Sequence, residues 1–269
     1  MLPENGGRPV QHPRIFLAGD SSVCTREISR APMAGWGQMF PLFFTQDVEI
    51  VNCARAGASS RTFAERGRLA WILDQLRPGD HLVVSFGLID HKPEKELRTE
   101  PFHDYQRNLR LFVDGARDRG AHPVLVSPHE RCTWDDHGNL RQVVQPYPMA
   151  MRELAAQTAT PYIDLYTQSL EWWTQLGPSG TRSLFMFLAP GQHPNYPEGI
   201  DDTTHFLPEG AIACARFVAH SLAQRGIVPP HWVTRLDQER FPEQAYGWLD
   251  DATHAALTQA RTRGTGDTL

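Results

Sequence analysis

Five short apolar segments, separated by segments with helical spacing, constrain the fold of this chain most strongly. The apolar runs are nearly continuous rather than alternating, which favours strands that are buried on both faces of a parallel sheet. The expected strands are 14–19, 48–54, 81–87, 122–128 and 161–166, and the expected helices are 35–44, 62–76, 102–120, 147–158 and 209–226. This pattern predicts a three-layer α/β/α sandwich around a five-stranded parallel sheet, of the flavodoxin-like type.

The alternating pattern defines one expected domain, residues 14–227, with a different segment at each end. Residues 1–13 are polar and contain Pro and Gly, which predicts a loose N-terminal arm. Residues 228–269 begin with two prolines and include two tryptophans and one possible short helix. We expect this second segment to be a C-terminal extension that packs on the domain.

The charge pattern argues against several kinds of partner. The net charge is -5 and no basic block is present, so nucleic acid is not expected as a partner. No apolar run approaches the roughly 20 residues that span a bilayer, so no membrane association is expected. The first residues lack the apolar core of a secretory signal, and a cytoplasmic location is the expectation. The sequence carries no signal for an oligomeric state.

Cysteine spacing argues against metal and disulfide chemistry. The four cysteines are scattered and form no C-x-x-C pair, so neither structural zinc nor a disulfide framework is expected. They are Cys24, Cys53, Cys132 and Cys214. We predict no metal site.

Polar residues with catalytic potential follow the expected strands, at the sheet edge where ligands of such folds bind. Ser21 follows the first strand, Gly57 the second, and Asp202 and His205 precede the last helix. A histidine can take the proton of a serine while a carboxylate fixes its tautomer. Asp202 and His205 are three residues apart, so one turn can present both toward Ser21. A serine after Gly-Asp is by itself usually a turn residue; the combination points to catalysis.

Four sequence blocks resemble those of the SGNH, or GDSL-like, hydrolases. They are "GDSS" at 19–22, "NCARAGASSRTF" at 52–63, "FGLID" at 86–90 and "HPNYPEGIDDTTHF" at 193–206. The "GWGQ" at 35–38 and the run at 196–211 are similar to the rhamnogalacturonan acetylesterase-like branch, and the resemblance covers roughly 14–226.

This resemblance implies roles for particular residues. Ser21 would be the nucleophile, His205 the general base and acid, and Asp202 its orienting partner. The backbone amides of Ser21 and Gly57 would form the oxyanion hole. Members of the family mostly remove acetyl or other short acyl groups from sugars without a cofactor.

The third block departs from the family pattern at one position. The family usually reads F-G-H-N-D, and its Asn side chain is a further oxyanion donor, but here that position is Ile89, which has no donor. Losing such a donor typically costs ~10²–10³ in rate. The nearby side chains that could replace it are Asn52, Ser59, Ser60, Arg61 and His91.

Three functions remain open at this stage. The first is a serine esterase that hydrolyses a short-chain ester of a small molecule through an acyl-enzyme. The second is an acyltransferase or cyclising biosynthetic enzyme, since Leu88 and Ile89 would make a drier site. The third is a non-catalytic binding protein, against which the retained Ser, Asp and His argue.

Further residues are candidates for contact with the substrate, because loops at this edge carry specificity. They are Asp20, Leu88, Ile89, His129 and His193, with Glu130 and Arg131 in the same loop as His129.

Overall fold

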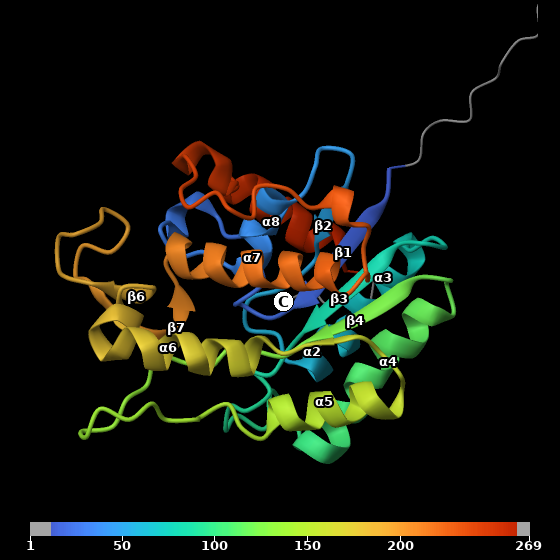
Figure 1. The fold of residues 1–269 in the computed structure, drawn as a ribbon, viewed down its shortest axis with the longest axis horizontal. Helices are drawn as coiled ribbons and strands as arrows, with labels where there is room; N and C mark the ends of the chain where they lie inside the picture. The colour runs from blue at the N-terminus through green and yellow to red at the C-terminus, as the bar shows by residue number, and fades with distance from the viewer. Residues whose placement is uncertain (1–11, 263–269) are drawn as a thin grey trace, which may run out of the picture.

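The computed structural model describes residues 12–262, and its centre is a five-stranded parallel sheet (Figure 1). The strands are β1 (Arg14–Gly19), β2 (Glu49–Asn52), β3 (His81–Ser85), β4 (His122–Val126) and β5 (Tyr162–Ile163). Their order is β2-β1-β3-β4-β5, and neighbouring strands run parallel. The five-stranded parallel sheet is therefore confirmed. Most of the predicted N-terminal arm lies outside the described residues.

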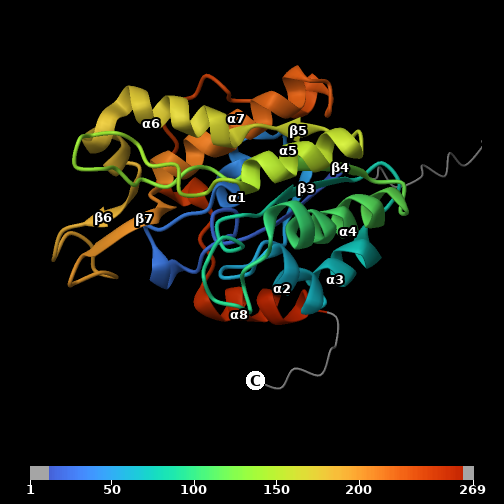
Figure 2. The same cartoon turned by 90° about the horizontal axis from the view of Figure 1, so that it is seen from below.

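Helices cover both faces of this sheet. They are α1 (Trp36–Met39), α2 (Ser60–Glu65), α3 (Arg68–Gln75), α4 (Gln106–Arg117), α5 (Tyr147–Gln157), α6 (Leu165–Arg182) and α7 (Pro208–Gln224). Ile15 and Leu17 of β1 pack with α1, α6 and α7, whereas Phe16 and Ala18 pack with α2, α3, α4 and α5. Figure 2 shows α6 and α7 on one side of the sheet and α2, α3 and α4 on the other. The predicted three-layer α/β/α sandwich is therefore confirmed.

Two of the predicted helices are interrupted. The predicted helix 35–44 contains α1 and then a 3-10 helix, η2 (Phe40–Phe43), because Pro41 has no N–H to donate to an earlier carbonyl. The predicted helix 62–76 is divided into α2 and α3 at Gly67, whose φ of 73° lies in the left-handed region. A further single turn, η1 (Ile28–Arg30), lies in a loop, and a π-helix, η3 (Pro101–Tyr105), leads directly into α4.

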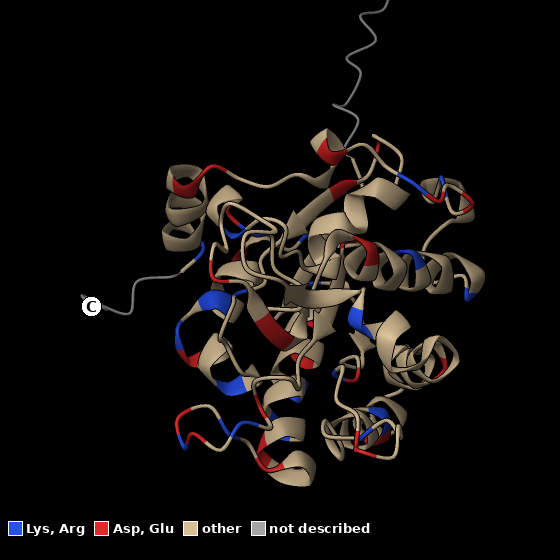
Figure 3. Ribbon diagram, turned by 90° about the vertical axis from the view of Figure 1, so that its left-hand side faces the viewer, with Lys and Arg blue, Asp and Glu red and all other residues tan. Residues whose placement is uncertain are grey.

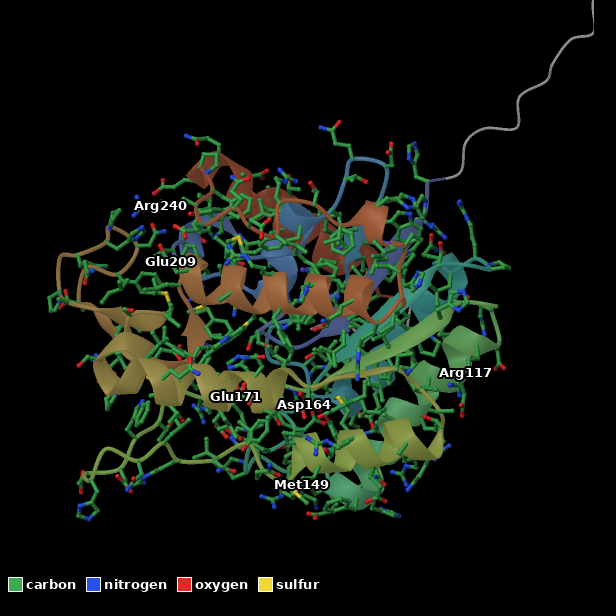
Figure 4. The ribbon with its side chains drawn as sticks, in the orientation of Figure 1. Arg117, Met149, Asp164, Glu171, Glu209 and Arg240 are labelled. Atoms are coloured by element: carbon green, nitrogen blue, oxygen red, sulfur yellow. The ribbon has the colours of Figure 1, made fainter. Side chains whose placement is uncertain are left out.

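Polar side chains fix the helix ends next to β5 (Figure 4). Asp164 caps α6, since its carboxylate accepts a hydrogen bond from the backbone N–H of Thr167 at 3.1 Å. Arg117, at the end of α4, donates to the carbonyl of Thr158, which follows α5, at 2.7 Å. The first bond fixes the start of α6, and the second ties the end of α4 to the end of α5.

An antiparallel hairpin that the sequence pattern did not predict projects from one end of the molecule (Figure 1). It consists of β6 (Phe185–Leu188) and β7 (Ile200–Phe206). Phe185 of β6 pairs with Phe206 of β7, and Phe187 of β6 pairs with Asp201 of β7. Between these two pairs, β7 therefore contains more residues than β6. The extra residues bulge out of the ladder, which re-aims their side chains.

The C-terminal segment lies along the edge of the sheet. It contains η4 (Pro230–Trp232), η5 (Glu243–Tyr246) and α8 (Asp251–Ala260). Arg68 of α3 donates to the carbonyl of Thr258 at 2.7 Å, and Arg261 donates to the carbonyl of Asn52 in β2. Since β2 is an edge strand, α8 covers backbone that would otherwise be exposed. The division of the chain at residue 227 stays a prediction.

Charged residues of both signs are interspersed over the face shown in Figure 3. Within residues 12–262, we find no helix that combines the length and the apolar character needed to cross a membrane.

Candidate active site

Ser21 lies in a tight turn that follows β1. The carboxylate of Asp20 accepts hydrogen bonds from the backbone N–H and the hydroxyl of Ser22, at 2.9 and 2.8 Å. Arg26 donates to the carbonyl of Ser21 at 3.0 Å. These bonds fix the backbone on both sides of Ser21.

Asp202 and His205 lie in the bulge of β7 and meet Ser21 there. The Nε2 atom of His205 lies 3.0 Å from the Oγ atom of Ser21. The Nδ1 atom of His205 lies 2.6 Å from the Oδ2 atom of Asp202. The spacing in the sequence predicted that one turn presents both residues, but in the structure a bulged strand presents them. The other carboxylate oxygen of Asp202 holds this bulge by accepting from the N–H groups of Thr204 and His205, at 2.8 and 3.1 Å.

The carboxyl group of Asp202 is ionised at neutral pH. Burial acts to raise its pKa, but the hydrogen bond from His205, the charge of that ring and the backbone N–H groups outweigh burial and lower the pKa to about 2. An ionised Asp202 favours the proton on Nδ1 of His205. The Nε2 atom is then free to accept a proton from Ser21.

A cavity of about 450 Å³ opens beside Ser21 and His205. Leu88 and Ile89 form an apolar part of its wall, and Lys92 and Arg131 bring two positive charges to it. The rest of the lining comes from residues 200–204. The cavity can therefore hold a small substrate with a short apolar group against Leu88 and Ile89.

Backbone N–H groups suited to an oxyanion occur next to Ser21. The N–H groups of Ser21 and Gly57 have no hydrogen-bond acceptor among residues 12–262. Gly57, with a φ of 76°, lies in a turn that Arg55 joins to the end of β1 by donating to the carbonyl of Gly19 at 2.9 Å. Ile89 reaches the cavity with a hydrocarbon side chain, so position 89 supplies no donor.

The five side chains that could replace the missing donor all have partners elsewhere. Asn52 donates to the carbonyl of Val23 at 2.8 Å, and Ser59 caps α2. Ser60 donates to the carboxylate of Asp90, and Arg61 donates to the carbonyl of Lys95. The ring of His91 forms a hydrogen bond with the carbonyl of Leu88. None of the five lines the cavity as the described residues define it.

The predicted substrate contacts divide into two groups. Leu88 and Ile89 line the cavity, whereas Asp20 is buried in the turn below Ser21, where burial raises its pKa. The ring of His129 is fully buried 4.2 Å from that of Phe206, behind the hairpin. His193 lies in the loop between β6 and β7, where it lines a different cavity with Trp248.

Sequence reasoning missed five residues of the cavity wall: Lys92, and Ile200, Asp201, Thr203 and Thr204 of β7. Lys92 stands three positions after Ile89 in the same loop, and this spacing is the one signal that could have indicated it. Among residues 12–262, no group of three or more His, Cys, Asp or Glu is arranged to hold a metal ion. The four cysteines are buried and unpaired.

The fold and this site define a class of protein. Residues 17–211 match the GDSL-like lipase/acylhydrolase family, and the chain belongs to this family. It is a hydrolase that acts on ester bonds. The chain is 40% identical to rhamnogalacturonan acetylesterase RhgT of Bacillus subtilis, over 86% of this chain and 98% of the relative. It is also 40% identical to a rhamnogalacturonan acetylesterase of Emericella nidulans, over 83% of this chain and 90% of the relative.

Solved structures agree with this assignment. The crystal structure of protein YXIM from Bacillus subtilis has a TM-score of 0.69 at 29% identity, covering 82% of this chain and 59% of that one. Axe2, an acetylxylan esterase from Geobacillus stearothermophilus, has a TM-score of 0.51 at 16% identity, covering 79% and 93%. At that identity the likeness to Axe2 concerns the fold alone. The family resemblance inferred from the sequence blocks, including the rhamnogalacturonan acetylesterase-like branch, is confirmed.

Proposed function

We propose that this protein is a serine acetylesterase that removes acetyl groups from acetylated sugars, with Ser21 as nucleophile. The proposal rests on two contacts of the His205 ring. Its Nε2 atom lies 3.0 Å from Oγ of Ser21, and its Nδ1 atom lies 2.6 Å from Oδ2 of Asp202. These are the distances that proton transfer from the serine hydroxyl requires.

The proposed reaction has two stages. The Oγ atom of Ser21 bonds to the ester carbonyl carbon while Nε2 of His205 takes the hydroxyl proton. The carbonyl electron pair moves to oxygen, and the N–H groups of Ser21 and Gly57 stabilise that oxyanion. The intermediate collapses, His205 protonates the departing sugar oxygen, and an acyl-enzyme remains. A water molecule, deprotonated by His205, then attacks the acyl carbon and releases the acid.

The relatives' names support a sugar as the alcohol part of the ester. Two relatives at 40% identity are called rhamnogalacturonan acetylesterases. The apolar wall of Leu88 and Ile89 suits a short acyl group such as acetyl. A cytoplasmic location, expected from the sequence, stays a prediction that cell fractionation would test.

Two measurements test the proposal. The wild type should hydrolyse p-nitrophenyl acetate and release acetate from acetylated rhamnogalacturonan oligosaccharides, and Ser21→Ala should lose both activities while keeping its fold. A fluorophosphonate probe should label the wild type and the matched control Ser22→Ala, but not Ser21→Ala. Undiminished hydrolysis by Ser21→Ala would contradict the role of Ser21, and an unlabelled, inactive wild type would favour a binding protein.

Acyl transfer is the second candidate, and the apolar wall of Leu88 and Ile89 favours it. A drier site slows attack by water relative to attack by a bound alcohol or amine. Incubation with an acyl donor and sugar or amine acceptors would distinguish the two reactions. If free acid is the sole product, the transferase alternative is wrong.

A further inference from the structure

The oxyanion site has two backbone donors but lacks the side-chain donor of its family. Ile89 stands at the position where the donor is expected. The polar side chains around it form hydrogen bonds with other groups of the protein. The same cavity contains two cationic side chains, Lys92 and Arg131. A cationic side chain in this cavity can stabilise a developing negative charge.

The backbone of Arg131 is held against the catalytic bulge. Its N–H donates to the carboxylate of Glu130 at 2.7 Å, and the next N–H, of Cys132, donates to the carbonyl of Thr203 at 2.8 Å. Thr203 lies between Asp202 and His205. Arg131 is therefore fixed beside the two residues that activate Ser21.

Among residues 12–262, the guanidinium group of Arg131 has neither a hydrogen-bond partner nor an ion-pair partner. Its Nε atom is fully buried and makes no hydrogen bond, and no carboxylate among residues 12–262 pairs with the group. Glu130 uses its oxygens on the backbone N–H groups of Arg131 and Val144, and Asp202 is bound to His205. A buried donor without an acceptor is costly, and a catalytic role is one reason why such a group is retained.

Arg131 and Ile89 line the same cavity. Burial lowers the pKa of the His91 ring, and the positive charge of Arg131 lowers it further. His91 is two residues after Ile89. Arg131 therefore reaches the cavity that Ile89 lines, although it comes from the loop after β4 rather than from the loop after β3.

We propose that Arg131 donates a hydrogen bond to the carbonyl oxygen of the ester as it becomes an oxyanion, in place of the side-chain donor absent at Ile89. The inference rests on the proposed function. When the Ser21 oxygen bonds to the carbonyl carbon, the carbonyl electron pair moves to oxygen and His205 takes the serine proton. Arg131 keeps all its protons and stabilises the charge, since a guanidinium does not deprotonate in proteins.

Lys92 is the weaker candidate for this role. An ammonium is a compact, strongly hydrated charge, whereas a guanidinium is weakly hydrated and has several donors in a fixed plane. The buried, unpartnered Nε atom belongs to Arg131. Lys92→Met is therefore the matched comparison, because it removes one positive charge from the same cavity.

A double-mutant cycle between Arg131 and Ile89 tests the proposal. The substrate is p-nitrophenyl acetate, which is neutral, so no carboxylate of the substrate can be the partner of Arg131. Arg131→Met should lower kcat by ~10²–10³ with little change in KM, the size seen when one oxyanion donor is lost. Arg131→Lys should lose less, and Lys92→Met should lose only a few-fold.

The most discriminating comparison uses Ile89→Asn, which restores a side-chain donor at position 89. Ile89→Asn should raise kcat at least ~10-fold in the Arg131→Met background but change it little in the wild type, because one donor then replaces the other. Strictly additive effects, or a Lys92→Met loss as large as that of Arg131→Met, would overturn the role of Arg131. Thermal unfolding of each variant, together with fluorophosphonate labelling of Ser21, checks that the fold and the nucleophile are intact.

The same assays separate this inference from the proposed function. Ester hydrolysis that requires Ser21 but is unchanged in Arg131→Met would overturn the inference alone. A wild type without Ser21-dependent hydrolysis would overturn the proposed function, and this inference with it.

Discussion

The Oγ atom of Ser21 lies 3.0 Å from Nε2 of His205, although 184 residues separate them in the chain. The segment before α1 connects their surroundings. The N–H of Trp36 donates to the carbonyl of Ser22 at 2.7 Å, and the N–H of Ala34 donates to the carbonyl of Phe206 at 3.0 Å. One short backbone segment is thus bonded to the residue after the serine and to the residue after the histidine.

Gly35→Ala should disturb this connection. A Cβ atom at Gly35 would lie 2.3 Å from the carbonyl oxygen of Cys24, and backbone cannot move away cheaply. We expect kcat to fall by roughly 10²-fold, as for other displacements of about 1 Å at a catalytic pair. Kinetics on p-nitrophenyl acetate measure the effect. Gly115→Ala is the control, because its Cβ would meet only the end of the Leu73 side chain; an equal loss there would contradict the argument.

Asp202→Asn should abolish most of the activity while keeping the bulge. The amide oxygen of Asn can still accept from the N–H groups of Thr204 and His205. It cannot stabilise a protonated His205 ring, so kcat should fall by ~10³–10⁴. Steady-state kinetics test this. A loss below tenfold would mean that His205 is oriented by another group.

Asp202 should also contribute to stability in a pH-dependent way. Its pKa is about 2 in the folded protein and near 3.8 without these contacts, so the folded state favours the ionised form. The contribution, about 2 kcal/mol, is present above pH ~4 and is lost as the pH falls through ~2. Denaturant unfolding of the wild type and Asp202→Asn should differ most near neutral pH and converge in acid. A difference that grows in acid would refute this.

Asp90 should have the opposite pH dependence. Burial raises its pKa to about 7, although Ser60 and Thr99 donate hydrogen bonds to the carboxylate at 2.5 and 2.9 Å. A raised pKa means that the folded state holds the proton more tightly. This contribution is complete below pH ~4 and is lost as the pH rises through ~7, on the order of a few kcal/mol. The unfolding free energy of the wild type, measured between these pH values, should therefore decline as the pH rises. Asp90→Asn should remove that decline.

Much of the fold could be predicted because its signals are local. The run that contains Ile15 and Leu17 is apolar along its whole length, and only a strand buried on both faces needs such a run. The β6–β7 hairpin escaped prediction because residues 200–206 are mostly polar. They form a strand through pairing with Phe185 and its neighbours, and single-sequence periodicity does not contain that information.

Local sequence was enough to identify the chemical types at the site and their order along the chain: a serine after β1, a glycine after β2, and an aspartate and a histidine before α7. Which hydrogen-bonding groups remain available depends on packing between distant segments. Asn52, Ser60 and His91 looked available in the sequence, but packing gives each a partner. Arg131 is brought to the same cavity without one. A side chain is free or occupied according to which distant groups packing places beside it, so that property is absent from any local pattern.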